Sequence, residues 1–343
     1  MAYTTINKST DYFNTVLWTT DGTGNKALTT GHSTDMVWIK FRDYAYDHRI
    51  YDDVRGVTKK IIPNKTDAES TTTDLASFDT NGFTVGSNLN SSGEGGLVGW
   101  SWKANGSGSS NTDGSITSTV SANTTSGFSI VKYTGTGSNA TIGTGLGAIP
   151  HMAIFKRTDT SGFNWFVYHR SLGAGKFIIL DTTGAEQSST SIWQNTTPTS
   201  SVITLGGDGG VNASGGTYIA YCFAEKKGFS KFGSYSSNNN VDGNFIYTGF
   251  SPAFVYIKQT NASGESSKMY DNKRLGYNVV ANWLEADDNQ AEGTGSNQID
   301  ILSNGFKLRA TNTAINASGG SYIYMAFAEA PLVSSNGVPT PAR

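Results

Sequence analysis

This sequence is poor in cysteine and in charged residues. Its 343 residues contain one cysteine, Cys222, so no disulfide can form within the chain. Charged residues make up only 15%, the formal net charge is −2, and no cluster of Lys and Arg stands out. Because binding to a phosphate backbone needs a basic surface, the composition predicts that nucleic acid is not a partner.

Long hydrophobic runs and a secretory start are also missing. The longer apolar runs, such as residues 218–223, fall far short of the roughly 20 residues that span a bilayer. Residues 1–10 lack the basic start and apolar stretch of a signal peptide, so we expect synthesis in a cytoplasm and no membrane insertion. Glycine, with 41 residues, is abundant together with Ser, Thr and Asn, which is typical of short strands joined by tight turns.

One sequence element is repeated along the chain. Residues 211–225 (Val-Asn-Ala-Ser-Gly-Gly-Thr-Tyr-Ile-Ala-Tyr-Cys-Phe-Ala-Glu) match residues 315–329 at ten of fifteen positions. Residues 95–104 form a weaker copy that keeps the paired glycines and the alternating strand after them. We expect the strands that end in Phe223 and Phe327 to be central and buried, because bulky apolar residues alternate along them.

Further elements recur in register with this repeat. An Asn-Gly pair, the strongest short hairpin signal, occurs at Asn81 and again at Asn304. The strand expected to open the third copy lies at residues 245–249. Two more strands precede the main repeat in every copy: Val37-Trp-Ile-Lys40, Ala153-Ile-Phe-Lys156 and Val255-Tyr-Ile-Lys258, and then the segments that start at Tyr51, Tyr168 and Tyr270.

The sequence therefore predicts an all-β protein with three tandem antiparallel units of the β-sandwich or jelly-roll-like type. We place unit 1 at residues 1–104 and a Gly/Ser linker at 105–114. Unit 2 follows at 115–228 and unit 3 at 243–331, with a packed connector at 229–242 between them. Residues 332–343 form a C-terminal tail.

No constellation of side chains indicates catalysis or a cofactor. The histidines do not occur in a metal-spaced pair, and no G-x-S-x-G elbow is present. His169 replaces the Asp52 and Asp271 of the other copies, and this change of chemical type favours an exposed position. Asp52 and Asp53 would point to opposite faces of a strand, which argues against a pair of glycosidase carboxylates. We assign no catalytic, cofactor or metal residue and expect no enzyme.

Two kinds of binding site stay open. Hard oxygen ligands for calcium occur without EF-hand spacing at Asp208, Asp242, Glu285, Asp287 and Asp288. Aromatic platforms for stacking a glycan could include Trp38, Trp165, Trp193 and Trp283. Most aromatic residues occupy alternating strand positions, however, which favours core packing over sugar binding.

The repeated motifs resemble those of a largely uncharacterised family of tailed-phage virion proteins with lectin-like sandwich repeats. The likeness covers nearly the whole chain and rests on Val37-Trp-Ile-Lys40, Tyr51-Asp-Asp-Val-Arg-Gly56, residues 127–135, residues 229–235 and the ending Ala326-Phe-Ala-Glu-Ala-Pro331. The resemblance implies a structural role in the virion, as a tail-fibre or capsid-decoration component, and no particular chemistry.

This resemblance leads to several expectations about partners. Other virion proteins are the expected partners, and the chain is expected to form homo-oligomers, as trimers by analogy with phage appendages. A tail module that binds a host-surface glycan or receptor is the alternative, and a polysaccharide-degrading tail enzyme is a third. The expected location is the virion, after synthesis in the host cytoplasm.

Overall fold

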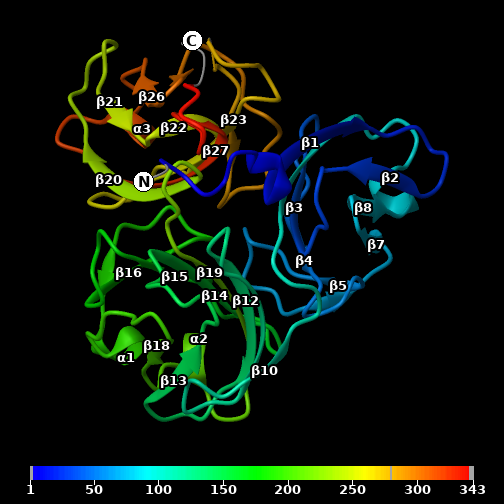
Figure 1. The fold of residues 1–343 in the computed structure, drawn as a ribbon, viewed down its shortest axis with the longest axis vertical. Helices are drawn as coiled ribbons and strands as arrows, with labels where there is room; N and C mark the ends of the chain where they lie inside the picture. The colour runs from blue at the N-terminus through cyan, green and yellow to red at the C-terminus, as the bar shows by residue number, and fades with distance from the viewer. Residues whose placement is uncertain (1–2, 279, 340–343) are drawn as a thin grey trace.

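A computed structural model describes residues 3–278 and 280–339, and its regular structure is almost entirely β-strand. Three sandwich units follow one another along the chain and lie around a common centre (Figure 1). All strand pairs in the sheets are antiparallel within the described residues, so the predicted all-β fold of tandem sandwich units is confirmed. No helix in the described part of the chain is long and apolar enough to cross a membrane.

Unit 1 packs a four-stranded sheet on a three-stranded one. The larger sheet has the order β1 (Phe13–Thr19), β9 (Gly96–Trp102), β3 (Met36–Phe41), β4 (Arg49–Asp52). The smaller sheet has the order β2 (Lys26–Thr29), β8 (Gly82–Val85), β7 (Leu75–Asp79). The short strands β5 (Lys59–Lys60) and β6 (Ser70–Thr71) form a hairpin beside β4, and η1 (Ser9–Asp11) and η2 (Ser87–Leu89) are single turns.

Unit 2 has the longest sheet. Its order is β10 (Ser109–Asn111), β11 (Ser118–Asn123), β12 (Phe128–Thr134), β19 (Thr217–Phe223), β14 (Met152–Arg157), β15 (Phe166–His169), β16 (Lys176–Ile179), β17 (Gln187–Ser188). The smaller sheet is the pair β13 (Ala140–Gly143) and β18 (Val202–Leu205). Two short helices accompany it, α1 (Thr190–Trp193) and α2 (Gly209–Asn212).

Unit 3 repeats this plan. Its larger sheet has the order β20 (Ser230–Ser236), β27 (Ser321–Pro331), β22 (Phe250–Gln259), β23 (Lys268–Asp271), β24 (Leu284–Glu285). The smaller sheet has the order β21 (Phe245–Tyr247), β26 (Gly305–Leu308), β25 (Ile299–Leu302), and α3 (Thr313–Asn316) precedes β27.

Strand register shows that the three units share one topology. In each unit the strand that begins the shared Lys-containing motif pairs with the repeated Gly-Gly strand at the same place. The three pairs are Val37 with Ser101, Ala153 with Cys222 and Val255 with Ala326. Each partner directly precedes the equivalent aromatic residue of the repeated strand, which is Trp102, Phe223 or Phe327. β9, β19 and β27 each lie between two neighbours and are buried along nearly their whole length. Both predictions, equivalent strands and central buried repeats, are confirmed.

The unit boundaries differ from the predicted ones at both junctions. The segment expected to be a connector, 229–242, contains β20, which pairs with β27 as the counterpart of β1 and β12. Residues 245–247 instead form β21, in the smaller sheet. The expected linker 105–114 contains β10, which extends the sheet of unit 2. Both β10 and β20 are rich in polar residues, so they have little of the apolar alternation by which a strand is predicted from sequence.

Each unit has its own core between its two sheets, and a fourth core joins all three units. The fourth core lies where the larger sheets face one another, and it includes residues from every unit. At its centre the rings of Trp102, Phe223 and Phe327 form a triangle with centroids 5.7 to 6.4 Å apart. Because these three residues are equivalent in register, the chain is a threefold pseudo-symmetric assembly around one shared aromatic core.

Candidate functional site

Ionisable side chains lie buried between the units at equivalent positions. Asp52, His169 and Asp271 occupy the same place in β4, β15 and β23, and each is at most 1% exposed. The expectation that this position is exposed, based on its change of chemical type, is therefore wrong. The type changes because the partner across the unit boundary changes as well.

At the boundary of units 1 and 2, Asp52 is bound by residues of both units. Its carboxylate accepts hydrogen bonds from Arg55 Nε at 2.6 Å and from the Tyr221 hydroxyl of unit 2 at 2.6 Å. Arg55 also donates to Glu69 at 3.2 Å. Every charged group in this cluster thus has a partner, as buried charges require.

The boundary of units 1 and 3 repeats the arrangement. Asp271 accepts from Arg274 Nε at 2.7 Å and from Trp100 Nε1 of unit 1 at 3.1 Å. Trp100 stands where unit 2 has Tyr221, two residues before the aromatic triangle. Glu292 completes the cluster by binding Arg274 and, in unit 1, both Nε and Nη2 of Arg42 at 2.9 Å.

At the boundary of units 2 and 3, Met325 occupies the position of Tyr221 and Trp100, and its side chain has no donor for a carboxylate. Its partner is correspondingly His169, whose Nε2 lies 3.4 Å from the carbonyl oxygen of Tyr324. Backbone hydrogen bonds close all three boundaries in the same cyclic sense, from the N–H groups of Glu69, Glu186 and Glu292 to the carbonyls of Thr158, Thr260 and Arg42. These polar groups therefore interlock the units.

Buried histidines predict a loss of stability in mild acid. Burial lowers the pKa of His169 and His32 to about 4, and that of His48 to about 3. An unfolded histidine titrates near pH 6.5, so below that pH the unfolded chain binds more protons than the folded one. The folded state should lose up to about 1.4 kcal/mol per histidine and pH unit, until the folded pKa is reached.

Urea unfolding at pH 7.5, 6.0 and 5.0 measures this loss. His169→Gln keeps a donor for the Tyr324 carbonyl but cannot be protonated, so its unfolding free energy should fall less over this range than that of the parent chain. Equal pH dependence of the two proteins would contradict a neutral buried His169.

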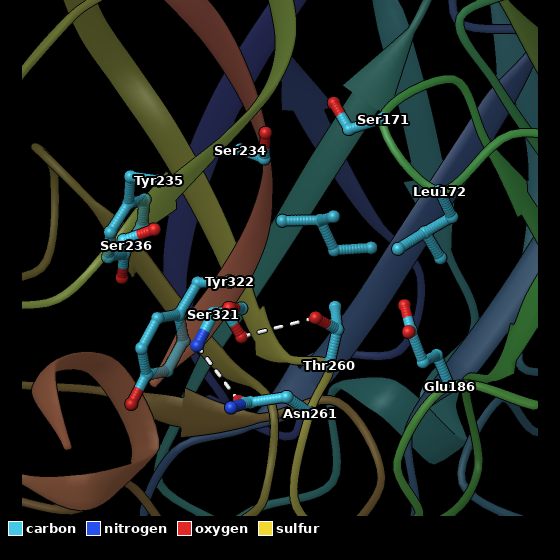
Figure 2. Close-up of a pocket in the computed structure, with 11 residues that line it drawn as sticks. Ser171, Leu172, Glu186, Ser234, Tyr235, Ser236, Thr260, Asn261, Ser321 and Tyr322 are labelled. Atoms are coloured by element: carbon cyan, nitrogen blue, oxygen red, sulfur yellow. Dashed lines mark hydrogen bonds between the residues drawn. The ribbon is translucent and has the colours of Figure 1, made fainter. Parts of the chain in front are cut away.

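A cavity of about 440 Å³ opens between units 2 and 3 (Figure 2). Its lining is rich in hydroxyl and amide groups, with Leu172 and Ile323 as apolar members: Ser171, Leu172, Glu186, Ser234, Tyr235, Ser236, Thr260, Asn261, Ser321, Tyr322 and Ile323. The serines at 171, 234 and 236 are exposed. Such a lining can exchange hydrogen bonds with a polar, uncharged ligand.

Several of the lining groups are already fixed within the fold. Asn261 Oδ1 accepts from the backbone N–H of Ser321 at 2.8 Å, and the Thr260 hydroxyl donates to the Ser321 carbonyl at 3.2 Å (Figure 2). The Tyr235 and Tyr322 rings stack at 5.0 Å, with their hydroxyls bonded to backbone carbonyls of residues 315 and 313. Glu186 is paired with Lys176. Much of the cavity wall is therefore held by contacts within the fold, and its exposed serines are the groups that can meet a ligand.

The four tryptophans considered for glycan stacking do not come together. Trp38 and Trp165 are buried in the shared core, and Trp193 is buried in the core of unit 2. No sugar can reach their rings, in agreement with the core packing that the sequence favoured. Trp283 is half-buried, with its ring against Gly293 and the Lys268 ammonium 5.2 Å from the ring centroid.

The candidate calcium ligands each have another partner in the fold. Asp208 caps α2 through the N–H of Gly210, Asp242 pairs with Lys307, and Glu285 pairs with Lys268. Asp287 and Asp288 accept backbone N–H groups of residues 267 and 289. Within residues 3–278 and 280–339, no three His, Cys, Asp or Glu side chains are grouped so that they could hold a metal ion.

Sequence reasoning missed a buried asparagine that organises the same loop in every unit. Asn212 and Asn316 are fully buried at the ends of the short helices α2 and α3. Each accepts from a backbone N–H in the loop after the first strand of its unit, at residues 136 and 239, and donates to a carbonyl just before its helix, at residues 206 and 310. Asn90 holds the corresponding loop of unit 1 by bonding Asp21 and the Gly24 carbonyl. The signal was present, because Asn90-Ser-Ser-Gly93 matches Asn-Ala-Ser-Gly in the other copies, with one residue inserted before the strand.

Comparison with known proteins gives one match. Residues 8–331 match the model of a family described as a domain of unknown function (DUF7483). Neither a curated protein nor a solved structure matches the chain. The matched residues include all three units and the core that they share. The chain belongs to the DUF7483 family.

Proposed function

We propose that this chain is a non-enzymatic structural protein of a phage particle, an outer component of the tail or the capsid. The observation that carries the structural part is the shared aromatic core, which closes three sandwich units into one body. A component on the outside of a particle must keep its shape under mechanical and chemical stress. The virion part of the proposal comes from the sequence resemblance.

The use of the buried charges supports a non-enzymatic role. Asp52 and Asp271 are buried and bound to arginines, and each also accepts a hydrogen bond from an aromatic residue of another unit. A catalytic carboxylate needs access to substrate and a proton to exchange, whereas these carboxylates fasten one unit to the next. The homotrimer expected from the sequence stays part of the proposal. It would have to use outer surfaces, because the larger sheets already bury their inner faces against one another.

Mass spectrometry of gradient-purified particles, from a phage that encodes this chain, tests the virion role. We expect the chain to co-sediment with infectious particles and to resist removal by a high-salt wash. Its absence from particles, with the chain found only in the soluble fraction of infected cells, would contradict the proposal.

Binding of a host-surface glycan is the second candidate function, and the cavity between units 2 and 3 favours it. Ser171→Trp should fill the cavity from the unit 2 side, and Ser110→Trp is the matched control at an exposed serine of unit 2 outside it. If the cavity binds the receptor, particles that carry Ser171→Trp assemble but adsorb to host cells less than the control. Equal adsorption of both would contradict this second function.

A further inference from the structure

In unit 2 the chain itself covers one side of the sandwich. The segment 109–123 runs along one edge of both sheets, where it contacts β12 of the larger sheet and β13 of the smaller one. β11 pairs with β12 from Thr119↔Lys132 to Asn123↔Phe128. The N–H of Ile116 donates to the Thr141 carbonyl of β13 at 3.0 Å.

This cover also contributes to the core. Ile116 and Val120 are both only 6% exposed and belong to the core of unit 2. They are four residues apart, with the hydroxyl residues Thr117, Ser118 and Thr119 between them. The segment thus closes the side of the sandwich with two aliphatic side chains and satisfies the backbone groups of the strand edges, which would otherwise be open to pairing.

In the equivalent strands of unit 3, β20 and β21, no described strand pairs with the outer edge. Each is the terminal strand of its sheet, and Figure 1 shows both at the outer margin of unit 3, on the left of the view. The hydroxyl of Tyr3 approaches this side, 3.5 Å from the hydroxyl of Tyr247 and bonded to the Gly249 carbonyl. A hydrogen bond of 2.6 Å from Asn244 Nδ2 to the Ser236 carbonyl joins the two edges. We call Ser234, Ser236, Phe245 and Tyr247 the open side of unit 3.

Backbone direction makes Ser234, Phe245 and Tyr247 competent to pair, whereas the outward carbonyl of Ser236 already accepts from Asn244. Ser237 N–H donates to the Gly320 carbonyl, so in β20 the odd-numbered residues face β27 and Ser234 directs its N–H and C=O outward. In β21 the N–H of Thr248 donates to Asn304, so the even-numbered residues face β26. Phe245 and Tyr247 consequently direct their backbone groups outward, as Thr141 does in unit 2.

The side chains at these places distinguish unit 3 from unit 1. Phe245 is 44% exposed and Tyr247 is 53% exposed, whereas the equivalent residues of β2 in unit 1 are the small Ala27 and Thr29. Large apolar side chains on an open sheet edge are uncommon in proteins that have no partner there. Unit 3 thus combines unpaired edges with apolar surface.

We propose that the open side of unit 3 binds an extended segment of another protein, in the way that residues 109–123 cover unit 2. The segment pairs with the edges of β20 and β21. It is uncharged, with two β-branched aliphatic residues four positions apart and small hydroxyl residues between them. This inference goes beyond the proposed virion role and does not depend on it.

A peptide with the sequence of residues 114–122, Gly-Ser-Ile-Thr-Ser-Thr-Val-Ser-Ala, is the probe. Labelled with a fluorophore and titrated with the full chain, it should bind saturably. Phe245→Asp should weaken binding at least about tenfold, because the aromatic contact surface is lost and a charge faces the peptide. Ala27→Asp, at the equivalent place in unit 1, is the matched control and should bind as the parent chain does.

The backbone contact is tested separately at Ser234. Ser234→Pro removes the outward N–H without removing a hydrogen bond to β27, whereas Ser234→Ala keeps that N–H. We expect the proline variant to lose binding at an unchanged melting temperature, and the alanine variant to retain it.

Three results would overturn the inference. They are no saturation up to about 1 mM peptide, equal binding by the Phe245→Asp and Ala27→Asp chains, and self-association of the parent chain that Phe245→Asp abolishes. The last result would assign the open side to a second copy of this chain.

Discussion

Replacing Phe327 with alanine should lower the free energy of unfolding by about 3 to 5 kcal/mol. Phe327 is 1% exposed and belongs to the aromatic triangle with Trp102 and Phe223. It also stacks on Phe13 of unit 1 at 4.9 Å, so the cavity left by alanine would lie between all three units. The surrounding rings come from different sheets and cannot all move inward, which places the cost in the upper range of such substitutions.

Urea unfolding followed by tryptophan fluorescence measures this effect. Phe245→Ala is the matched control, because Phe245 lies in the same unit but is 44% exposed, and its loss should change stability by less than about 1 kcal/mol. A cost below about 1 kcal/mol for Phe327→Ala as well would mean that the shared core does not hold the units together.

Removing one partner of a buried ion pair should have an effect of similar size. Arg274→Met keeps an unbranched side chain, shorter than arginine, and leaves the Asp271 carboxylate buried without its guanidinium. We expect a loss of about 3 to 5 kcal/mol in the free energy of unfolding, because the remaining charge has no access to water. Trp100 and the backbone N–H groups of residues 273 and 274 still donate to Asp271, but these neutral donors do not replace the charge of the guanidinium.

A double variant distinguishes the loss of the ion pair from the cost of burying one unpaired charge. Asp271→Leu combined with Arg274→Met removes both charges, and stability should return to within about 1 to 2 kcal/mol of the parent chain. The exposed pair Lys8 and Asp11 is the control, where Asp11→Ala should cost less than about 1 kcal/mol. If Arg274→Met lowered the free energy of unfolding as little as Asp11→Ala, the buried pair would not stabilise the boundary between units 1 and 3.

Local pattern was enough to predict the repeated part of the fold. The strands at 37–40, 153–156 and 255–258 and the Gly-Gly strands that end in Trp102, Phe223 and Phe327 were all recognisable, and they pair as expected. Strand β20 was missed because its residues, Ser-Lys-Phe-Gly-Ser-Tyr-Ser, carry little apolar alternation. An edge strand needs only one buried face, so its sequence is close to that of a loop.

The candidate sites could be predicted far less well. The cavity combines residues of five separated segments from two units, and none of those segments indicates a site by itself. Trp38 and Trp165 were considered for sugar binding because a sequence does not reveal which of the two strand faces meets another unit. Both faces of the larger sheets turned out to be buried, one in the unit and one in the shared core.

By itself the sequence determined that this protein is all-β, unable to form a disulfide within the chain and built from three copies of one unit, because strand alternation, turn residues and repeats are local properties. Only the tertiary structure decided how the copies close around one core, why Asp52 and Asp271 are buried with arginines while His169 stands in their place in unit 2, and which strand edges stay open. Those outcomes depend on contacts between residues roughly a hundred positions apart, and a residue's own neighbours in the chain do not encode its distant partner.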